Sequence, residues 1–79
     1  MNFVYMATTG SNDPTKASLP LHLAANGSVE VGHDTALILA GDATELLLGD
    51  NADQMHGVGV PPVRELLAKL RDHSVPVYV

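Results

Sequence analysis

The amino-acid sequence predicts a single α/β domain built on a parallel β-sheet. Two apolar runs, residues 3–7 and 35–40, each lead through a short polar turn into a helical pattern. An amphipathic helix then begins near Pro62 and leads into a last apolar run, residues 75–79. The resulting order is strand, helix, strand, helix, strand. Because long connections separate the strands, the strands must be parallel and joined by right-handed crossovers.

The composition fits one small domain with an aliphatic core and excludes several classes of function. Hydrophobic residues make up 46% of the 79 residues, but aromatic residues only 4%. A net charge of −5, from four basic and nine acidic residues, argues against nucleic acid and anionic membranes as partners. The chain has no cysteine, which removes disulfides, thiolate zinc sites and thiol chemistry. Neither a membrane-spanning run nor a leader pattern is present, so we expect a cytoplasmic protein.

The first predicted strand and the helix after it form the strand-to-helix unit around which the rest of the sequence is organised. The run 3–7 is apolar without alternation, which is typical of a strand covered on both faces. Asp13 is a good N-cap and Pro14 suits the first helical position, so we expect a helix from Pro14 to Val31. Its middle is apolar on nearly every side, which predicts cover from its own sheet and from another subunit. Pro20 should kink this helix.

The second strand-to-helix unit repeats the pattern in shorter form. Residues 35–40 are the second predicted buried strand. Asp42 is the expected N-cap of a helix over residues 43–48, and Glu45 completes a variant capping box. Residues 50–55 should add another turn or two.

The third helix has the clearest period in the chain. Glu65 and Lys69 have the spacing of an ion pair on its solvent side. Its apolar stripe recurs at i, i+3, i+4 and i+7 in Val63, Leu66, Leu67 and Leu70. The strand that follows leaves a sheet of three strands with two unpaired borders, whereas parallel sheets lie inside larger layers. We therefore expect residues 1–79 to be a single but incomplete domain.

The polar turn after the first strand is the leading candidate for a binding site. It lies at the carboxyl edge of the sheet before a helix amino terminus, where hydroxyl and N–H groups could hold phosphate, sulfate, a persulfide or a nucleotide. The alternative is a helix-capping turn without a ligand, since the same residue types form ordinary turns. The residues of this turn are Thr8, Thr9, Gly10, Ser11 and Asn12.

Three further residues are candidates near the same edge. Gly41 and Asp42 follow the second strand, although Asp42 is also the expected N-cap. His56 precedes a glycine-containing loop and is the only histidine kept as a candidate. The histidines lack the spacing of a metal site, and no catalytic residue can be identified. We therefore expect neither a metal nor a cofactor.

Six short motifs occur in order along nearly the whole chain. They are VYMAT (4–8), DPTKASLP (13–20), EVGH (30–33), LAGDA (39–43), GVGVPP (57–62) and VPVYV (75–79). Together they resemble the DsrE/DsrF-like family of small sulfur-relay proteins. The resemblance implies a three-layer α/β/α domain of flavodoxin-like build, with a five-stranded parallel sheet in the order 4-3-2-1-5. It also implies assembly into dimers, trimers or hexamers.

The resemblance further implies a reactive cysteine in the loop after the third strand, through which some family members pass persulfide sulfur. Only the first three strands of that pattern are present in this sequence, and the cysteine is absent. Since some members are similar to selenoproteins, one hypothesis is that the reading frame was cut at a selenocysteine codon in that loop.

Three functional interpretations remain open. The first is a DsrE-like protein of sulfur or selenium relay that lacks the catalytic cysteine in this chain. It would act in a homo-oligomer or with related subunits, and a sulfur-carrier protein would be its partner. The second is a non-catalytic small-anion or nucleotide-binding module. The third is an oligomer-scaffold subunit whose apolar first helix docks on partners.

Overall fold

The computed structural model describes residues 2–79, and its elements follow the predicted order. They are β1 (Asn2–Ala7), α1 (Pro14–Leu23), the π-helical η1 (Ala24–Ser28), β2 (Asp34–Leu39), the 3-10 helix η2 (Gly41–Leu47), α2 (Asn51–Gln54), α3 (Val63–Asp72) and β3 (Val77–Tyr78). The predicted mixed α/β class is confirmed. None of the helices formed by residues 2–79 is long and apolar enough to cross a membrane.

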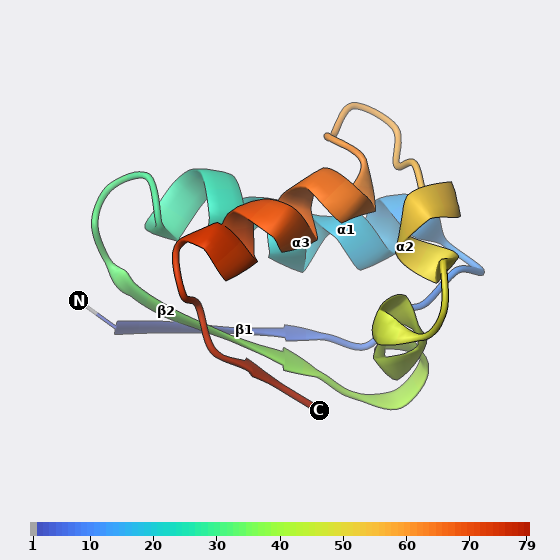
Figure 1. Cartoon of the computed structure of the whole chain (residues 1–79), viewed down its shortest axis with the longest axis horizontal. Helices are drawn as coiled ribbons and strands as arrows, with labels where there is room; N and C mark the ends of the chain where they lie inside the picture. Colours follow the sequence, from blue (N-terminus) through green and yellow to red (C-terminus); the bar gives the residue numbers. More distant parts are fainter. Residues whose placement is uncertain (1) are drawn as a thin grey trace.

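The sheet has three parallel strands with β2 in the middle. β1 pairs with β2 from Asn2–Asp34 to Ala7–Leu39, and β2 pairs with β3 around Leu37–Val77. Both crossovers therefore step across the sheet in the same direction. Right-handed crossovers that step in one direction place their helices on one face. Figure 1 shows this arrangement, with α1 and α3 together on one side of the sheet.

Because α1 and α3 lie on the same side of the sheet, residues 2–79 form two layers rather than the three that the resemblance implies. The prediction that β1 is covered on both faces is also wrong for these residues. Val4 is 64% exposed and Met6 59% exposed on the open face, while Tyr5 and Ala7 pack toward the helices. β1 is thus a half-buried strand whose outward residues happen to be apolar, which hides the alternation in the sequence.

The core lies between the helices and the sheet and is aliphatic, as the composition predicts. α3 contributes the predicted stripe, in which Val63, Leu66 and Leu70 are buried and Leu67 is half-buried. The fully buried Leu37 of β2 belongs to the same cluster. Each buried leucine stabilises the fold by about 1.5–3 kcal/mol relative to its exposed state. Packing of α3 on the sheet is therefore a main source of stability.

The first helix begins where the sequence predicts but ends earlier. Asp13 caps it, because its carboxylate accepts a hydrogen bond from the Lys16 N–H at 3.1 Å. Pro20 lies inside the helix, and the chain beyond α1 widens into the π-helical turn η1. The helical segment then ends at Ser28, short of the predicted Val31. The missing N–H of a proline weakens the regular ladder, which fits the change of helix type that follows.

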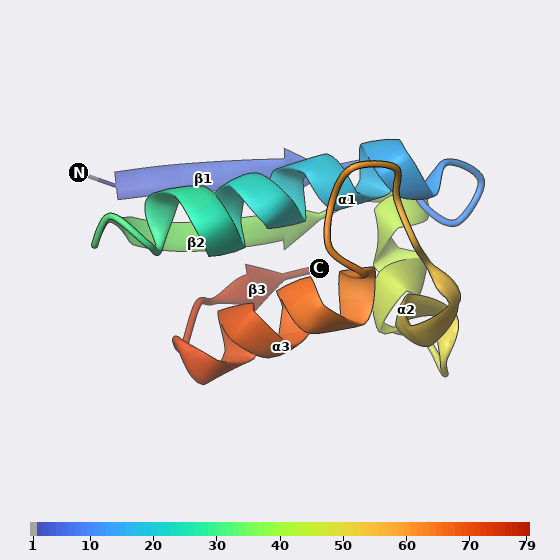
Figure 2. The same cartoon turned by 90° about the horizontal axis from the view of Figure 1, so that it is seen from above.

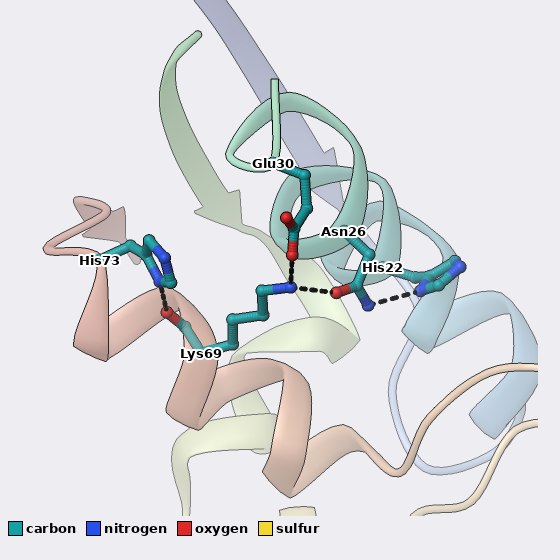
Figure 3. Close-up of polar contacts among 5 residues, drawn as sticks. All are labelled: His22, Asn26, Glu30, Lys69 and His73. Atoms are coloured by element: carbon teal, nitrogen blue, oxygen red, sulfur yellow. Dashed lines mark hydrogen bonds and ion pairs between the residues drawn. The ribbon is translucent and has the colours of Figure 1, made fainter. Parts of the chain in front are cut away.

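A series of polar contacts joins α3 to the first helix (Figure 3). The Lys69 ammonium donates to the Asn26 amide oxygen at 2.6 Å and pairs with Glu30. The Asn26 amide nitrogen lies 3.0 Å from His22 Nδ1. Hydrogen bonding and charge from Lys69 lower the pKa of Glu30. The predicted ion pair with Glu65 does not form, because Lys69 turns toward η1 instead.

Candidate functional site

The predicted binding turn connects β1 to α1 at the carboxyl edge of the sheet. A hydrogen bond from the Asp13 N–H to the Gly10 carbonyl oxygen closes it at 3.1 Å. Its residues differ in exposure, with Thr8, Ser11 and Asn12 exposed, Thr9 half-buried and Gly10 buried. The structure therefore brings all five residues to one tight turn directly before the capped end of α1.

A carboxylate from the chain itself binds this turn. Glu45 of η2 accepts a hydrogen bond from the Ser11 N–H, and hydrogen bonding to Ser11 lowers the pKa of Glu45. Gly10 packs so closely against η2 that a β-carbon there would lie 2.5 Å from the Asp42 carbonyl oxygen. The Ser11 N–H, one of the candidate donors to a free anion, thus binds an internal carboxylate. Binding of a free anion by the turn stays a prediction.

Gly41 and Asp42 lie at the same edge. Gly41 has a φ of 56°, and a β-carbon there would lie 3.8 Å from the Thr8 carbonyl oxygen, so the two turns are neighbours. Asp42 is exposed and is not an N-cap, because η2 begins at Gly41 and its cap position is Ala40. The predicted capping box is therefore wrong. Glu45 reaches across to the first turn rather than back to the start of its own helix.

The loop that follows His56 also reaches this edge. The Val58 N–H donates to Thr15 Oγ1 at 3.0 Å, and a β-carbon on Gly57 would lie 3.1 Å from the Thr15 Cα. The loop therefore rests on the first turn of α1. The structure brings the loop to the edge, where the exposed His56 forms no hydrogen bond with residues 2–79.

The edge is acidic, and its groups are largely bonded to one another. Asp13, Asp42 and Glu45 border it, so a second anion would meet like charges. Among residues 2–79, no three histidine, aspartate or glutamate side chains are grouped so that they could hold a metal ion. Thiol chemistry is excluded because the chain has no cysteine. The arrangement is suited to joining the two strand-to-helix turns.

A groove between α3 and β3 was missed by the sequence reasoning. It has a volume of about 550 Å³, and its lining includes Leu67, Val77, Arg64 and Arg71. The sequence does indicate that Arg64 and Arg71 lie on the same face of the helix, because they are spaced i, i+7. The sequence pattern of one helix could not predict that α3 lies beside β3.

The class of protein that these features define is a two-layer α/β domain with parallel strands. Comparison of the chain with protein-family models, with curated proteins and with solved structures finds no match.

Proposed function

We propose that this chain is a non-catalytic subunit of a cytoplasmic sulfur-relay assembly of the DsrE/DsrF kind. The observation that carries the proposal is the strand order, in which β2 lies between β1 and β3. The order 4-3-2-1-5 implied by the resemblance also places the second strand between the first and the third. A flavodoxin order of 2-1-3 would place the first strand in the middle instead.

The role assigned to the chain is to position a partner rather than to carry sulfur. Transfer of persulfide sulfur needs a thiolate, and this chain has no cysteine. The reactive sulfur or selenium atom would therefore lie outside residues 1–79.

Exposed apolar side chains support association with such subunits. Val4, Met6 and Tyr78 are 64%, 59% and 59% exposed on the open face of the sheet. Leu19 and Leu23 of α1 are 45% and 53% exposed. The first helix, which the sequence predicts to be covered partly by another subunit, thus has apolar surface to offer to one.

The test is to isolate the tagged chain from its own cells while persulfides are trapped with an alkylating reagent. Mass spectrometry of the purified complex should show a stoichiometric partner that carries a trapped persulfide on cysteine. Isolation of the chain alone, or with partners whose cysteines are unmodified, would contradict the proposal. A chain carrying Val4→Lys and Met6→Lys serves as the control, since it should lose partners that cover the open face.

A second candidate, an oligomer scaffold without a part in sulfur transfer, is favoured by the charge of the open face. Asp34, at one end of β2, is the only charged residue among the described strands. A second copy could approach this face with little repulsion, although the chain as a whole carries −5. Light scattering over a range of concentrations should then show dimers or larger species. A folded monomer at micromolar concentration would eliminate this candidate and leave the first one standing.

A further inference from the structure

Asn26 is the only asparagine of the chain that precedes a glycine, and the pair lies in the π-helical turn η1. Both residues are half-buried. In an Asn-Gly pair the peptide nitrogen of the glycine can attack the side-chain amide of the asparagine, because glycine has no side chain to hinder the approach. The pair therefore has the chemistry needed for spontaneous deamidation.

The reaction at this pair needs only water. The Gly27 nitrogen forms a bond to Cγ of Asn26, the bond from Cγ to Nδ2 breaks, and the amide group leaves as ammonia with the proton of the Gly27 N–H. Water then opens the succinimide ring at either of its carbonyl groups. One opening leaves aspartate at position 26. The other leaves isoaspartate, in which the main chain runs through the side-chain carbon.

The fold holds the Asn26 side chain away from that nitrogen (Figure 3). Its amide nitrogen lies 3.0 Å from Nδ1 of His22, four residues earlier, and its amide oxygen accepts a hydrogen bond from the Lys69 ammonium at 2.6 Å. Helical side chains point toward the amino terminus of their helix. The Asn26 amide is therefore directed back along the helix and toward α3, whereas the Gly27 nitrogen lies on its carboxyl side. Attack requires the side chain to leave both partners first.

Lys69 ties this turn to α3, which runs beside the first helix (Figure 2). It also pairs with Glu30, so one ammonium group binds both ends of the segment 26–30. The Lys69 side chain is only 28% exposed, so its bonds are partly shielded from water. The turn itself opens readily, because a π-helical turn is an irregular form and glycine is a poor helix former. Lys69 thus opposes the local opening that the reaction needs.

We propose that Asn26–Gly27 is a self-modification site and that Lys69 sets its rate by holding the amide in an unreactive position. Formation of isoaspartate inserts a carbon atom into the main chain of η1 and displaces the group that Lys69 binds. Conversion therefore releases the turn from α3 irreversibly. This modification is independent of the sulfur-relay role, since every group that it uses lies within residues 22–69.

The opposite role for Lys69 makes the opposite prediction. A donor on the amide oxygen would stabilise the negative charge that develops there during attack, and Lys69 would then accelerate the reaction. The geometry argues against this role, because the same bond keeps the Asn26 amide away from the Gly27 nitrogen.

The test is incubation of the full chain under warm, mildly alkaline conditions, followed by peptide mapping with mass spectrometry. Asn26 should convert much more slowly in the folded parent than in the same chain unfolded in urea. Lys69→Met should raise the rate in the folded chain about tenfold, a factor that a hydrogen bond from a charged group commonly contributes to a local equilibrium. In the converted chain, the ¹⁵N amide signals of η1 and of α3 around Lys69 should shift.

Matched variants separate the contact from general effects. Lys16→Gln removes an exposed lysine of α1 and should leave the rate unchanged. Gly27→Ala should slow conversion with or without Lys69, because the methyl group hinders the attack. The fold accepts that methyl group, since a β-carbon at Gly27 would meet no atom within 4 Å. Hydrogen exchange in Lys69→Met should accelerate at η1 and keep the parental rate in β2, which shows that the opening is local.

Four results would overturn the proposal. The first is conversion of Asn26 as fast in the folded parent as in urea. The second is a Lys69→Met rate that is unchanged or lower, and a lower rate would mean that Lys69 assists the attack. The third is faster exchange in β2 as well as in η1, since the whole fold then opens. The fourth is a converted chain whose α3 signals are those of the parent, because the turn would then not have been released.

Discussion

The turn at the carboxyl edge and the groove beside β3 both combine polar groups with buried surface, but only the turn satisfies those groups from within the chain. At the turn, Glu45 occupies the Ser11 N–H and Gly10 packs against the backbone of η2. At the groove, Arg64 and Arg71 line an open, largely apolar channel. The sequence pattern of a binding turn is therefore also the pattern of a turn that only joins two parts of the fold. Capacity to bind lies where groups are left without internal partners.

The most destabilising substitution should be one on the core side of α3, when compared with one on its groove side. Leu66→Ala removes a side chain that is 1% exposed and should lower the free energy of unfolding by about 2–5 kcal/mol. Leu67→Ala removes a half-buried side chain of the groove and should cost roughly 1 kcal/mol. Urea denaturation followed by circular dichroism measures both. Equal losses of unfolding free energy in the two variants would mean that Leu67 belongs to the core rather than to the lining of the groove.

The next effect concerns the close packing of the turn. Gly10→Ala places a methyl group 2.5 Å from the Asp42 carbonyl oxygen, so the turn or η2 must move, at a cost of about 1–3 kcal/mol. Gly27→Ala is the matched control, because its β-carbon would meet no atom within 4 Å. In a helical segment that change should be neutral or stabilise by up to about 1 kcal/mol. Similar melting temperatures for the two variants would show that the turn is loosely packed.

A smaller effect appears as a pH dependence at the turn. The pKa of Glu45 is lower in the folded chain than its ordinary value of 4.5, so its stabilisation is complete above that pH and is lost as the pH falls through the folded value. The melting temperature of the parent should therefore fall more steeply than that of Glu45→Gln below about pH 5. Glu65→Gln, at an exposed position, is the control and should keep the parental slope. Parallel curves for the parent and Glu45→Gln would contradict the contact with Ser11.

The smallest effect belongs to the groove charges. Arg64→Gln and Arg71→Gln should each change the free energy of unfolding by no more than about 0.5 kcal/mol, because both side chains are exposed. Thermal melts of the two single variants measure this. A loss of stability as large as that expected for Gly10→Ala would mean that the arginines stabilise the fold. The arginines would then have partners within the chain, as the groups of the turn do.

The elements that sequence reasoning predicted well are those with a strong local signal. The stripe of α3 follows from apolar spacing alone, and Asp13 with Pro14 marks a helix start through hydrogen-bonding and dihedral preferences. The parallel arrangement follows from the long connections between strands. The predicted end of the first helix was less accurate, because the helix contains Pro20 and changes to a π-helical turn, and the sequence signals for both changes are weak.

Contacts between residues far apart in the sequence could not be predicted from local patterns. Glu45 had a plausible local role in a capping box, and only the tertiary fold brings it to Ser11. Lys69 likewise had a neighbour at helical spacing but pairs with Glu30 in the turn after η1. The open face of the sheet was missed because Val4 and Met6 are as apolar as the residues between them. A run of hydrophobic residues predicts a strand, but it does not indicate which face of the strand is covered.

The contact of Lys69 with Asn26 has a consequence for the proton of His22. A lysine ammonium only donates, so the Asn26 atom that it meets at 2.6 Å must be the amide oxygen. The amide NH₂ group then points to His22 Nδ1, which must accept, and the neutral imidazole carries its hydrogen on Nε2. Nitrogen chemical shifts of the ring should identify this single tautomer, and Lys69→Met should restore a mixture of the two.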